Sequence, residues 1–196
     1  GKITPSANKV SLSYLTKGCT GLTSITIPDS VTSIGDFAFD GCTGLERVNI
    51  TNLAKWCEID FGYGLSNPLE LAHNLYLNGE FVTDLVIPNG VTSIGRIAFP
   101  GCTGLTSIMI PDSVTSIGEW TFPGCTGLTS ITIPDSVTSI REGAFYECTG
   151  LTSINIPNRV TRIGQSAFYG CTGLKRVDIT DLAKWCEIDF MGAHSN

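Results

Sequence analysis

The sequence predicts a β-rich, right-handed solenoid that extends as one domain over residues 1–196. A cysteine recurs every 23 residues, apolar residues return at fixed places between the cysteines, and glycine or proline closes each short segment. A unit this short cannot bury its own apolar face, so the units must stack on one another. The period therefore predicts a row of repeats with one continuous core.

The first element of each unit is expected to be a short strand with the pattern L-x-x-I-x-I-P, as in residues 105–111. The leucine and both isoleucines face inward, and proline ends the strand because it cannot continue a ladder. At ~4.8 Å per rung, seven rungs make a stack of roughly 30–35 Å. The seven strands are expected to begin at Leu22, Leu45, Val82, Leu105, Leu128, Leu151 and Leu174.

Two further elements complete the unit. The phrase V-T-S-I-G predicts a second short extended segment that glycine closes. The phrase G-x-x-A-F-x-G-C, as in residues 35–42, predicts one helical or 3₁₀ turn that places Ala38 and Phe39 in the core.

The period is broken once. Cys42 and Cys102 are 60 residues apart, which is two units plus 14 residues, and we assign the extra material to an insertion at residues 53–79. Asn78-Gly79 between two apolar runs predicts a hairpin. Trp56 and Phe61 are expected in the core of the insertion.

Both ends of the chain are expected to differ from a full unit. Residues 1–18 contain half a unit, which predicts an N-terminal cap. Residues 171–196 closely match residues 42–67 at an offset of 129, which predicts a truncated last repeat without the hairpin. Trp185 and Phe190 repeat Trp56 and Phe61 there. This end indicates either a fragment of a longer array or a natural C-terminus.

The unit C-x-x-L-x-x-I-x-I-P-x-x-V-x-x-I-G-x-x-A-F-x-G resembles the BspA-type leucine-rich repeat, over roughly residues 19–196. The insertion, which begins LAKWCEIDF, resembles a segment that recurs in such arrays. The resemblance implies an extracellular or cell-surface protein that binds other proteins, such as host matrix or cell-surface proteins. It implies neither one particular ligand nor catalytic residues.

Composition narrows the classes of partner. The net charge of −6, with 12 basic and 18 acidic residues, argues against nucleic acid and against an anionic membrane surface. No apolar run approaches the ~20 residues that a membrane helix needs. The oligomeric state stays open.

The reactive side chains do not predict a catalytic or metal site. The eight cysteines include no C-x₂-C pair, so zinc has little support. The repeat cysteines are expected to be buried free thiols. For Cys57 and Cys186, pairing with Cys42 or Cys171 is the alternative. His73 and His194 lack triad-like spacing, which favours structural roles. No cofactor is expected.

Departures from the repeat are more informative about function than the repeat itself. Arginine and aromatic residues are enriched at interfaces, and solenoids bind partners along exposed sheet faces. We therefore predict a cell-surface or secreted protein-binding or adhesion module without catalytic activity. The alternatives are a structural spacer and an accessory repeat domain of a larger surface protein or enzyme. The candidate partner-binding face comprises Glu46, Arg47, Asn49, Asp84, Met109, Trp120, Lys175, Arg176 and Asp178.

Overall fold

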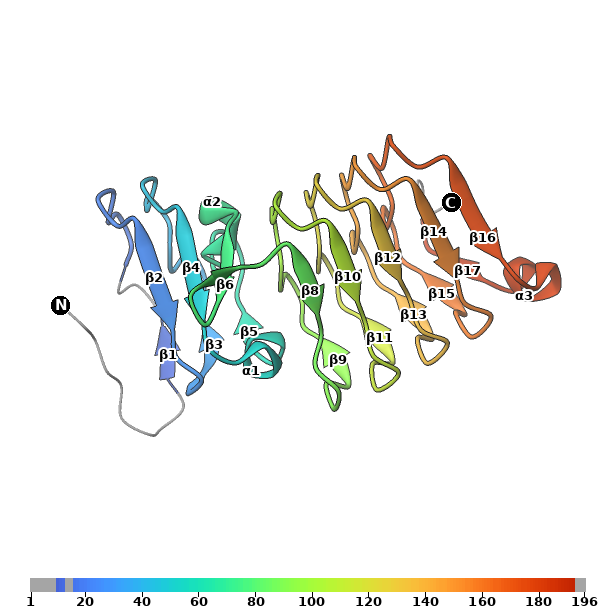
Figure 1. Ribbon diagram of the computed structural model, residues 1–196, viewed down its shortest axis with the longest axis horizontal. Coiled ribbons are helices and arrows are strands. Elements are labelled where there is room, and N and C mark those ends of the chain that lie inside the picture. Colours follow the sequence, from blue (N-terminus) through green and yellow to red (C-terminus); the bar gives the residue numbers. More distant parts are fainter. Residues whose placement is uncertain (1–9, 13–15, 193–196) are drawn as a thin grey trace.

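The computed structural model describes residues 10–12 and 16–192, and it forms a solenoid whose short strands stack along one long axis (Figure 1). The predicted fold class is confirmed. A regular turn of the solenoid contributes one strand to a main face and another short strand to a second face, then returns through a series of tight turns. Most of the expected N-terminal cap, residues 1–18, lies outside the described residues.

Among residues 10–12 and 16–192, eight strands run in the same direction along the main face, and they are parallel wherever neighbouring rungs pair. Equivalent positions of the 23-residue unit are in register, so that Ile108 pairs with Leu85 on one side and Ile131 on the other. The strands are β2 (Ser24–Ile27), β4 (Arg47–Ile50), β6 (Leu75–Leu77), β8 (Asp84–Val86), β10 (Ser107–Met109), β12 (Ser130–Thr132), β14 (Ser153–Ile156) and β16 (Arg176–Ile179).

The second face is formed by the predicted V-T-S-I-G segments and their counterparts. All its strand pairs are also parallel. The strands are β1 (Val10–Leu12), β3 (Val31–Ile34), β5 (Asp60–Phe61), β9 (Ser93–Ile94), β11 (Ser116–Ile117), β13 (Ser139–Ile140), β15 (Arg162–Ile163) and β17 (Asp189–Phe190).

The return segment of the unit is a series of tight turns, in which the Ala38 N–H donates to the Gly35 carbonyl at 3.3 Å and the Asp40 N–H to the Phe37 carbonyl at 3.1 Å, as in a 3₁₀ turn. Ala38 and Phe39 are buried as expected. However, Phe37 has a φ of 54°, which a right-handed helix does not allow. The Phe39 N–H donates to the Leu65 carbonyl of the following rung rather than within its own turn. The N–H groups of this segment therefore alternate between bonds within the turn and bonds to the following rung, and no longer helix forms.

Stacked phenylalanines form the centre of the core. The rings of Phe99, Phe122, Phe145 and Phe168 follow one another at centroid distances of 5.4, 5.7 and 5.4 Å, with interplanar angles of 11° or less. The repeat cysteines lie beside this stack, and the Cys148 thiol donates to the Phe122 carbonyl at 3.1 Å. The unit therefore uses its thiol to join one rung to the preceding one.

The insertion adds a strand to the main face that the sequence did not predict. It contains α1 (Leu53–Cys57), β5, α2 (Leu69–Ala72) and β6, followed by β7 (Glu80–Phe81). Strand β6 pairs in parallel with β4, and the predicted hairpin is confirmed because β6 and β7 pair antiparallel around Asn78-Gly79. One turn thus carries both β6 and β8, so seven predicted rungs become eight strands.

Two side chains of the insertion make the hydrogen bonds that the backbone of a preceding regular rung would make. In the repeats, a carbonyl such as that of Thr121 accepts from the backbone of the preceding rung. The equivalent Ala98 carbonyl instead accepts from Trp56 Nε1 at 2.9 Å and from Asn67 Nδ2 at 3.1 Å. Asn67 also donates to the Ile97 carbonyl at 2.7 Å. These bonds join the insertion to the regular repeats that follow.

The second copy of the insertion sequence ends the described chain. There α3 (Leu182–Cys186) and β17 repeat α1 and β5. Leu53 is 5% exposed in the first copy, whereas its counterpart Leu182 is 68% exposed. Trp56 and Phe61 are buried as predicted, and their counterparts Trp185 and Phe190 are partly buried against the core.

Candidate functional surface

One row of outward-facing side chains runs along the main face, with a single position from each strand. The register aligns Thr26, Asn49 and Tyr76 on one side of the insertion, and Val86, Met109 and Thr132 on the other. The row continues with Asn155 and Asp178. It is polar towards both ends and becomes apolar where the repeat is interrupted.

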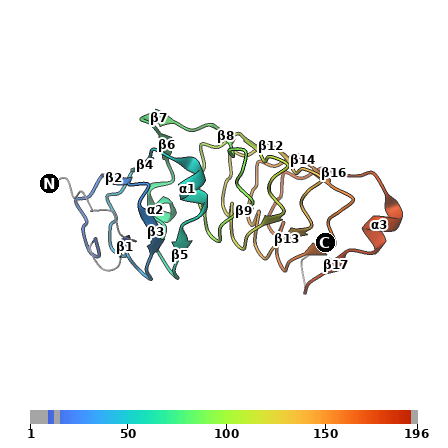
Figure 2. The ribbon, with the colours of Figure 1, turned by 90° about the horizontal axis from the view of Figure 1, so that it is seen from below.

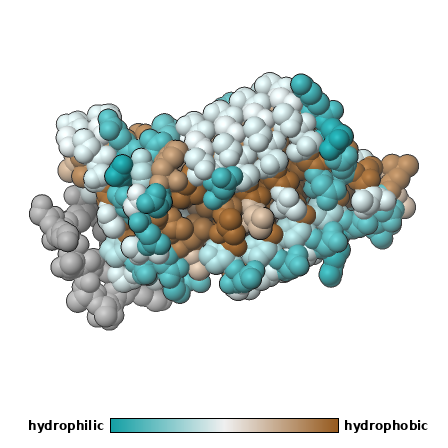
Figure 3. Space-filling model, viewed as in Figure 1, coloured by the Kyte–Doolittle hydropathy of each residue, from teal (hydrophilic) through white to brown (hydrophobic). Residues whose placement is uncertain are grey.

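The apolar part of this row is exposed to solvent. Val86 is 57% exposed, Met109 is 61% exposed, and Phe81 on the adjacent hairpin is 42% exposed. Figure 3 shows apolar surface in the middle of this face, beside a paler band. We call Tyr76, Phe81, Val86 and Met109 the central patch. A cluster of exposed apolar residues marks an interaction surface more often than a single exposed apolar residue does.

A predicted arginine borders the central patch. The Arg47 guanidinium carbon lies 3.9 Å from the centroid of the Tyr76 ring, and the Tyr76 and Phe81 rings are 5.3 Å apart. Glu46 is exposed beside it, and Asn49 is half-buried with its amide donating to the Ile25 carbonyl. The structure therefore brings Glu46 and Arg47 next to the aromatic hairpin.

Asp84 supplies an exposed carboxylate at the other border of the central patch. It accepts hydrogen bonds from the hydroxyls of Ser107, Thr106 and Thr83. These bonds, led by the one from Ser107, lower the pKa of the Asp84 carboxyl. Since stable hydrogen bonding favours the charged form, this position carries a fixed negative charge at neutral pH.

The remaining predicted residues lie elsewhere. Lys175, Arg176 and Asp178 belong to the last rung, four strand spacings or ~19 Å from β8, and Arg176 is paired with Asp178 at 2.9 Å. Trp120 lies in the turn after β11, where its ring contacts Tyr146 at 5.1 Å. The candidate face is therefore split, and only its first five members lie around the central patch.

Three members of the central patch were missing from the predicted site. Val86 and Met109 stand where the rungs after them have threonine, asparagine or aspartate, and the departure at Val86 was available in the sequence. Tyr76 and Phe81 flank the Asn78-Gly79 turn, and a two-residue turn makes its flanking residues cross-strand neighbours. Their contact could therefore have been inferred from the hairpin alone.

A groove of about 400 Å³ lies beneath the central patch. Its lining residues come from α1, from the β6–β7 hairpin and from β8. Leu75 and Leu77 form one wall, and Leu85 and Val86 form the other. Glu80 and Asp84 add two carboxylates to the lining, so the groove combines apolar walls with an acidic border.

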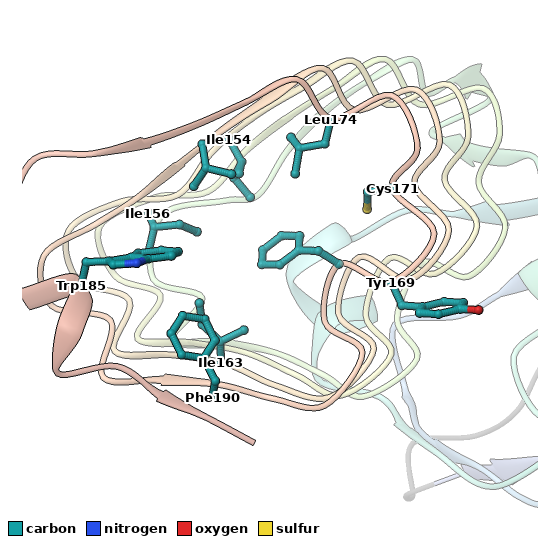
Figure 4. A pocket seen from close by; sticks show the side chains of 10 residues that line it. Ile154, Ile156, Ile163, Tyr169, Cys171, Leu174, Trp185 and Phe190 are labelled. Atoms are coloured by element: carbon teal, nitrogen blue, oxygen red, sulfur yellow. The ribbon is translucent and has the colours of Figure 1, made fainter. Parts of the chain in front are cut away.

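A second cavity of about 380 Å³ lies at the C-terminal end of the described chain (Figure 4). Ile154, Ile163 and Leu174 point into it, whereas Tyr169 points away. Its other lining residues, among them Trp185 and Phe190, also belong to the core of the last rung. The cavity is an exposed cross-section of the core.

The buried positions of most cysteines do not favour nucleophilic chemistry. All eight cysteines are free, and Cys42, Cys57, Cys102, Cys125 and Cys148 are buried. Burial raises the pKa of Cys57 to about 12 and that of Cys171 to about 11, so both hold their protons at neutral pH. Cys19 and Cys186 are exposed.

Other kinds of site find little support in the described part of the chain. Residues 10–12 and 16–192 contain no group of three or more potential metal ligands. Within the same residues no helix is long and apolar enough to cross a membrane. His73 ends α2 with a φ of 58°, in agreement with a structural role. His194 lies outside the described residues.

Comparisons with known proteins agree with this architecture. The family model described as BspA type leucine-rich repeat region matches six copies over residues 12–60 and 70–192. A leucine-rich repeat protein from Bacteroides ovatus is 33% identical, with a TM-score of 0.56, over 89% of this chain and 42% of that one. No curated protein matches the chain.

Two further solved structures are similar. A T. pallidum leucine-rich repeat protein is 29% identical over 86% of this chain and 61% of that one, with a TM-score of 0.46. The pneumococcal vaccine antigen PcpA is 21% identical over 82% of this chain and 39% of that one, with a TM-score of 0.58, which shows the fold alone. The chain thus spans less than two thirds of each of these proteins.

Proposed function

Since the chain belongs to the BspA-type leucine-rich repeat family, we propose that it is a non-catalytic protein-binding module of a cell-surface or secreted protein, with a role in adhesion. Solenoid repeat proteins present an extended surface that binds other proteins, and the partners bind along its exposed strands. Family membership supports the surface location and the adhesive role. The partner is a protein, such as one of host matrix or of a neighbouring cell.

The observation that carries this proposal is the change in outward-facing residues on the main face. Away from the interruption, the row along the main face presents polar residues: threonine, asparagine or aspartate. At the interruption the same positions become Tyr76, Val86 and Met109, with Arg47 stacked beside them. Aromatic residues, methionine and arginine are the types enriched in the buried centres of protein interfaces.

The test compares capture of partners by two designed variants. Val86→Thr with Met109→Thr gives both rungs the residue that Thr132 already has in the next rung, so the fold should tolerate the change. Replacing Glu46 and Arg47 with alanine removes the charged border. Asn155→Thr is the matched control two rungs from Met109.

We expect immobilised native protein and Asn155→Thr to recover the same proteins from host matrix extract or serum. The central-patch variant and the charged-border variant should each recover at least tenfold less. Equal recovery by all four proteins would contradict the proposed surface. If no protein recovers a partner, the result favours a structural spacer.

A further inference from the structure

The main sheet is open at the interruption, where β7 and β8 lie at the ends of two separate sheets. Within the described residues, β8 pairs only with β10 and β7 pairs only with β6. Figure 1 shows the wide spacing between β6 and β8, and Figure 2 shows β7 standing out from the main face. Two strand edges therefore border the groove beneath the central patch.

The backbone of β8 points unused hydrogen-bonding groups towards this groove. The Thr83 carbonyl and the Ile87 N–H bond to β10. Alternate residues of a strand in a parallel sheet bond to opposite neighbours, so the N–H and C=O groups of Asp84 and Val86 point the other way. In every later rung of this sheet the equivalent groups bond to the preceding strand.

The edge of β7 is open in the same way. Leu77 and Glu80 flank the two-residue turn, and the Val82 N–H donates to the Leu75 carbonyl. The intervening pair, Tyr76 and Phe81, is then a non-hydrogen-bonded pair, so the backbone groups of Phe81 point away from β6. Phe81 and Asp84 are three residues apart and can be separated by at most ~10 Å. One inserted strand requires two strand spacings of ~4.8 Å each, and this limit allows them.

The lining of the groove specifies which side chains such a strand would carry. Leu75, Leu77 and Leu85 make the inner surface apolar. Glu80 and Asp84 are exposed at the border, and the ion pairs of the described residues do not include either of them. Strand side chains alternate between two faces.

We propose that this groove binds an extended segment of the partner protein as an added strand, with apolar side chains facing inward and lysine or arginine side chains facing outward. The inference rests on the proposed function and names the binding mode at its central patch. Strand addition satisfies the free backbone groups of Asp84 and Val86, which a helical segment would leave unpaired. The carboxylates of Glu80 and Asp84 favour basic residues and repel acidic ones.

The probe is an end-capped, fluorescently labelled seven-residue peptide of alternating lysine and valine, and its binding is followed by fluorescence anisotropy. A peptide of the same composition with its lysines and valines in separate blocks controls for charge. An alternating glutamate and valine peptide controls for strand propensity. We expect the alternating lysine peptide to bind at least tenfold more tightly than either control peptide, and to protect the Asp84 and Val86 amides from hydrogen exchange.

Two protein variants locate the binding. Val86→Pro removes an N–H that does not bond to β10, and proline is tolerated at a sheet edge, so the variant should fold. Its affinity for the alternating lysine peptide should fall at least tenfold. Asp84→Lys tests the charge without touching the backbone and should also weaken binding at least tenfold. Asp112→Lys makes the same charge change in an exposed turn and should leave the affinity unchanged.

The strand-addition mode is overturned if the block peptide binds as well as the alternating one, if Asp84→Lys has no effect, or if no peptide binds. Those outcomes are distinct from failure of the proposed function, which is decided by recovery of a protein partner. A partner that depends on Val86 and Met109 but not on Asp84 would retain the function and exclude this mode.

Discussion

Single residues set how closely the rungs can approach. In the repeated phrase C-T-G-L, a side chain on Gly150 would collide with the Thr126 carbonyl of the preceding rung. The equivalent Gly127 faces the Thr103 carbonyl in the same way. Glycine is required there because the backbones touch.

Gly150→Ala should therefore destabilise the protein by about 2–3 kcal/mol, because the rungs must separate to admit a methyl group. The matched control is Gly21→Ala in the first rung, where an added Cβ meets nothing within 4 Å. Its effect should stay within about 0.5 kcal/mol. Urea unfolding of both variants measures the difference, and equal losses would contradict the steric explanation.

The buried thiols make stability depend on pH. Burial raises the pKa of Cys57 to about 12 and of Cys171 to about 11, whereas a thiol in the unfolded chain ionises near ~8.5. The folded chain then holds protons that the unfolded chain releases. The stabilisation is complete below pH ~8.5 and is lost as the pH rises towards the folded values.

The free energy of unfolding should consequently fall between pH 9 and 11 by about 1.4 kcal/mol per pH unit for each buried thiol. Burial also raises the pKa of Cys148. Cys148→Ser should therefore remove the contribution of one buried thiol, about 1.4 kcal/mol per pH unit, from the slope. Cys186→Ser, at an exposed position, should leave it unchanged. Denaturant unfolding at several pH values measures the slopes, and identical slopes for all three proteins would refute the explanation.

At the scale of elements, the two copies of the insertion sequence show what neighbours contribute. Helices α1 and α3 share the sequence LAKWC, and each begins at a side-chain cap, Asn52 or Asp181. The first copy is covered by the following repeats, and the Trp56 indole N–H donates to the Ala98 carbonyl. The second copy has the same local structure with its helix exposed.

Trp56→Phe should cost about 1–3 kcal/mol because a buried carbonyl loses one of its donors. Trp185→Phe makes the identical change in the exposed copy and should cost less than about 0.5 kcal/mol. Thermal unfolding of the two variants gives the comparison. Similar losses would mean that ring packing, and not the bond to Ala98, determines the stability of the junction.

The sequence predicted the elements that its period repeats. Strands such as β10 and β11 and the buried Phe39 follow from alternation and spacing, and the hairpin follows from Asn78-Gly79. Strand β6 was missed because it pairs with β4 at a spacing of 27 residues instead of 23. The choice between a helical and a 3₁₀ turn stayed open in the sequence, because some N–H groups of the turn segments bond to another rung, which local sequence does not reveal.

At the scale of the molecule, the interruption divides the stack. The main face consists of β2, β4, β6 and β7 on one side and the rungs from β8 onward on the other. The apolar core, Trp56, Asn67 and the bond from Gly95 N–H to the Cys57 carbonyl connect the two parts. The candidate site could be predicted only in part, because its open edges arise from the placement of whole strands.

The central claim is that the interruption leaves a strand edge open beneath exposed apolar residues. Residue-resolved hydrogen exchange of the native protein tests this at Val86, Met109 and Thr132, which occupy the same position in three consecutive rungs. The open edge predicts that the Val86 amide exchanges at least a hundredfold faster than the other two. Equal protection of all three amides would show that the sheet is closed at β8 and would contradict the account.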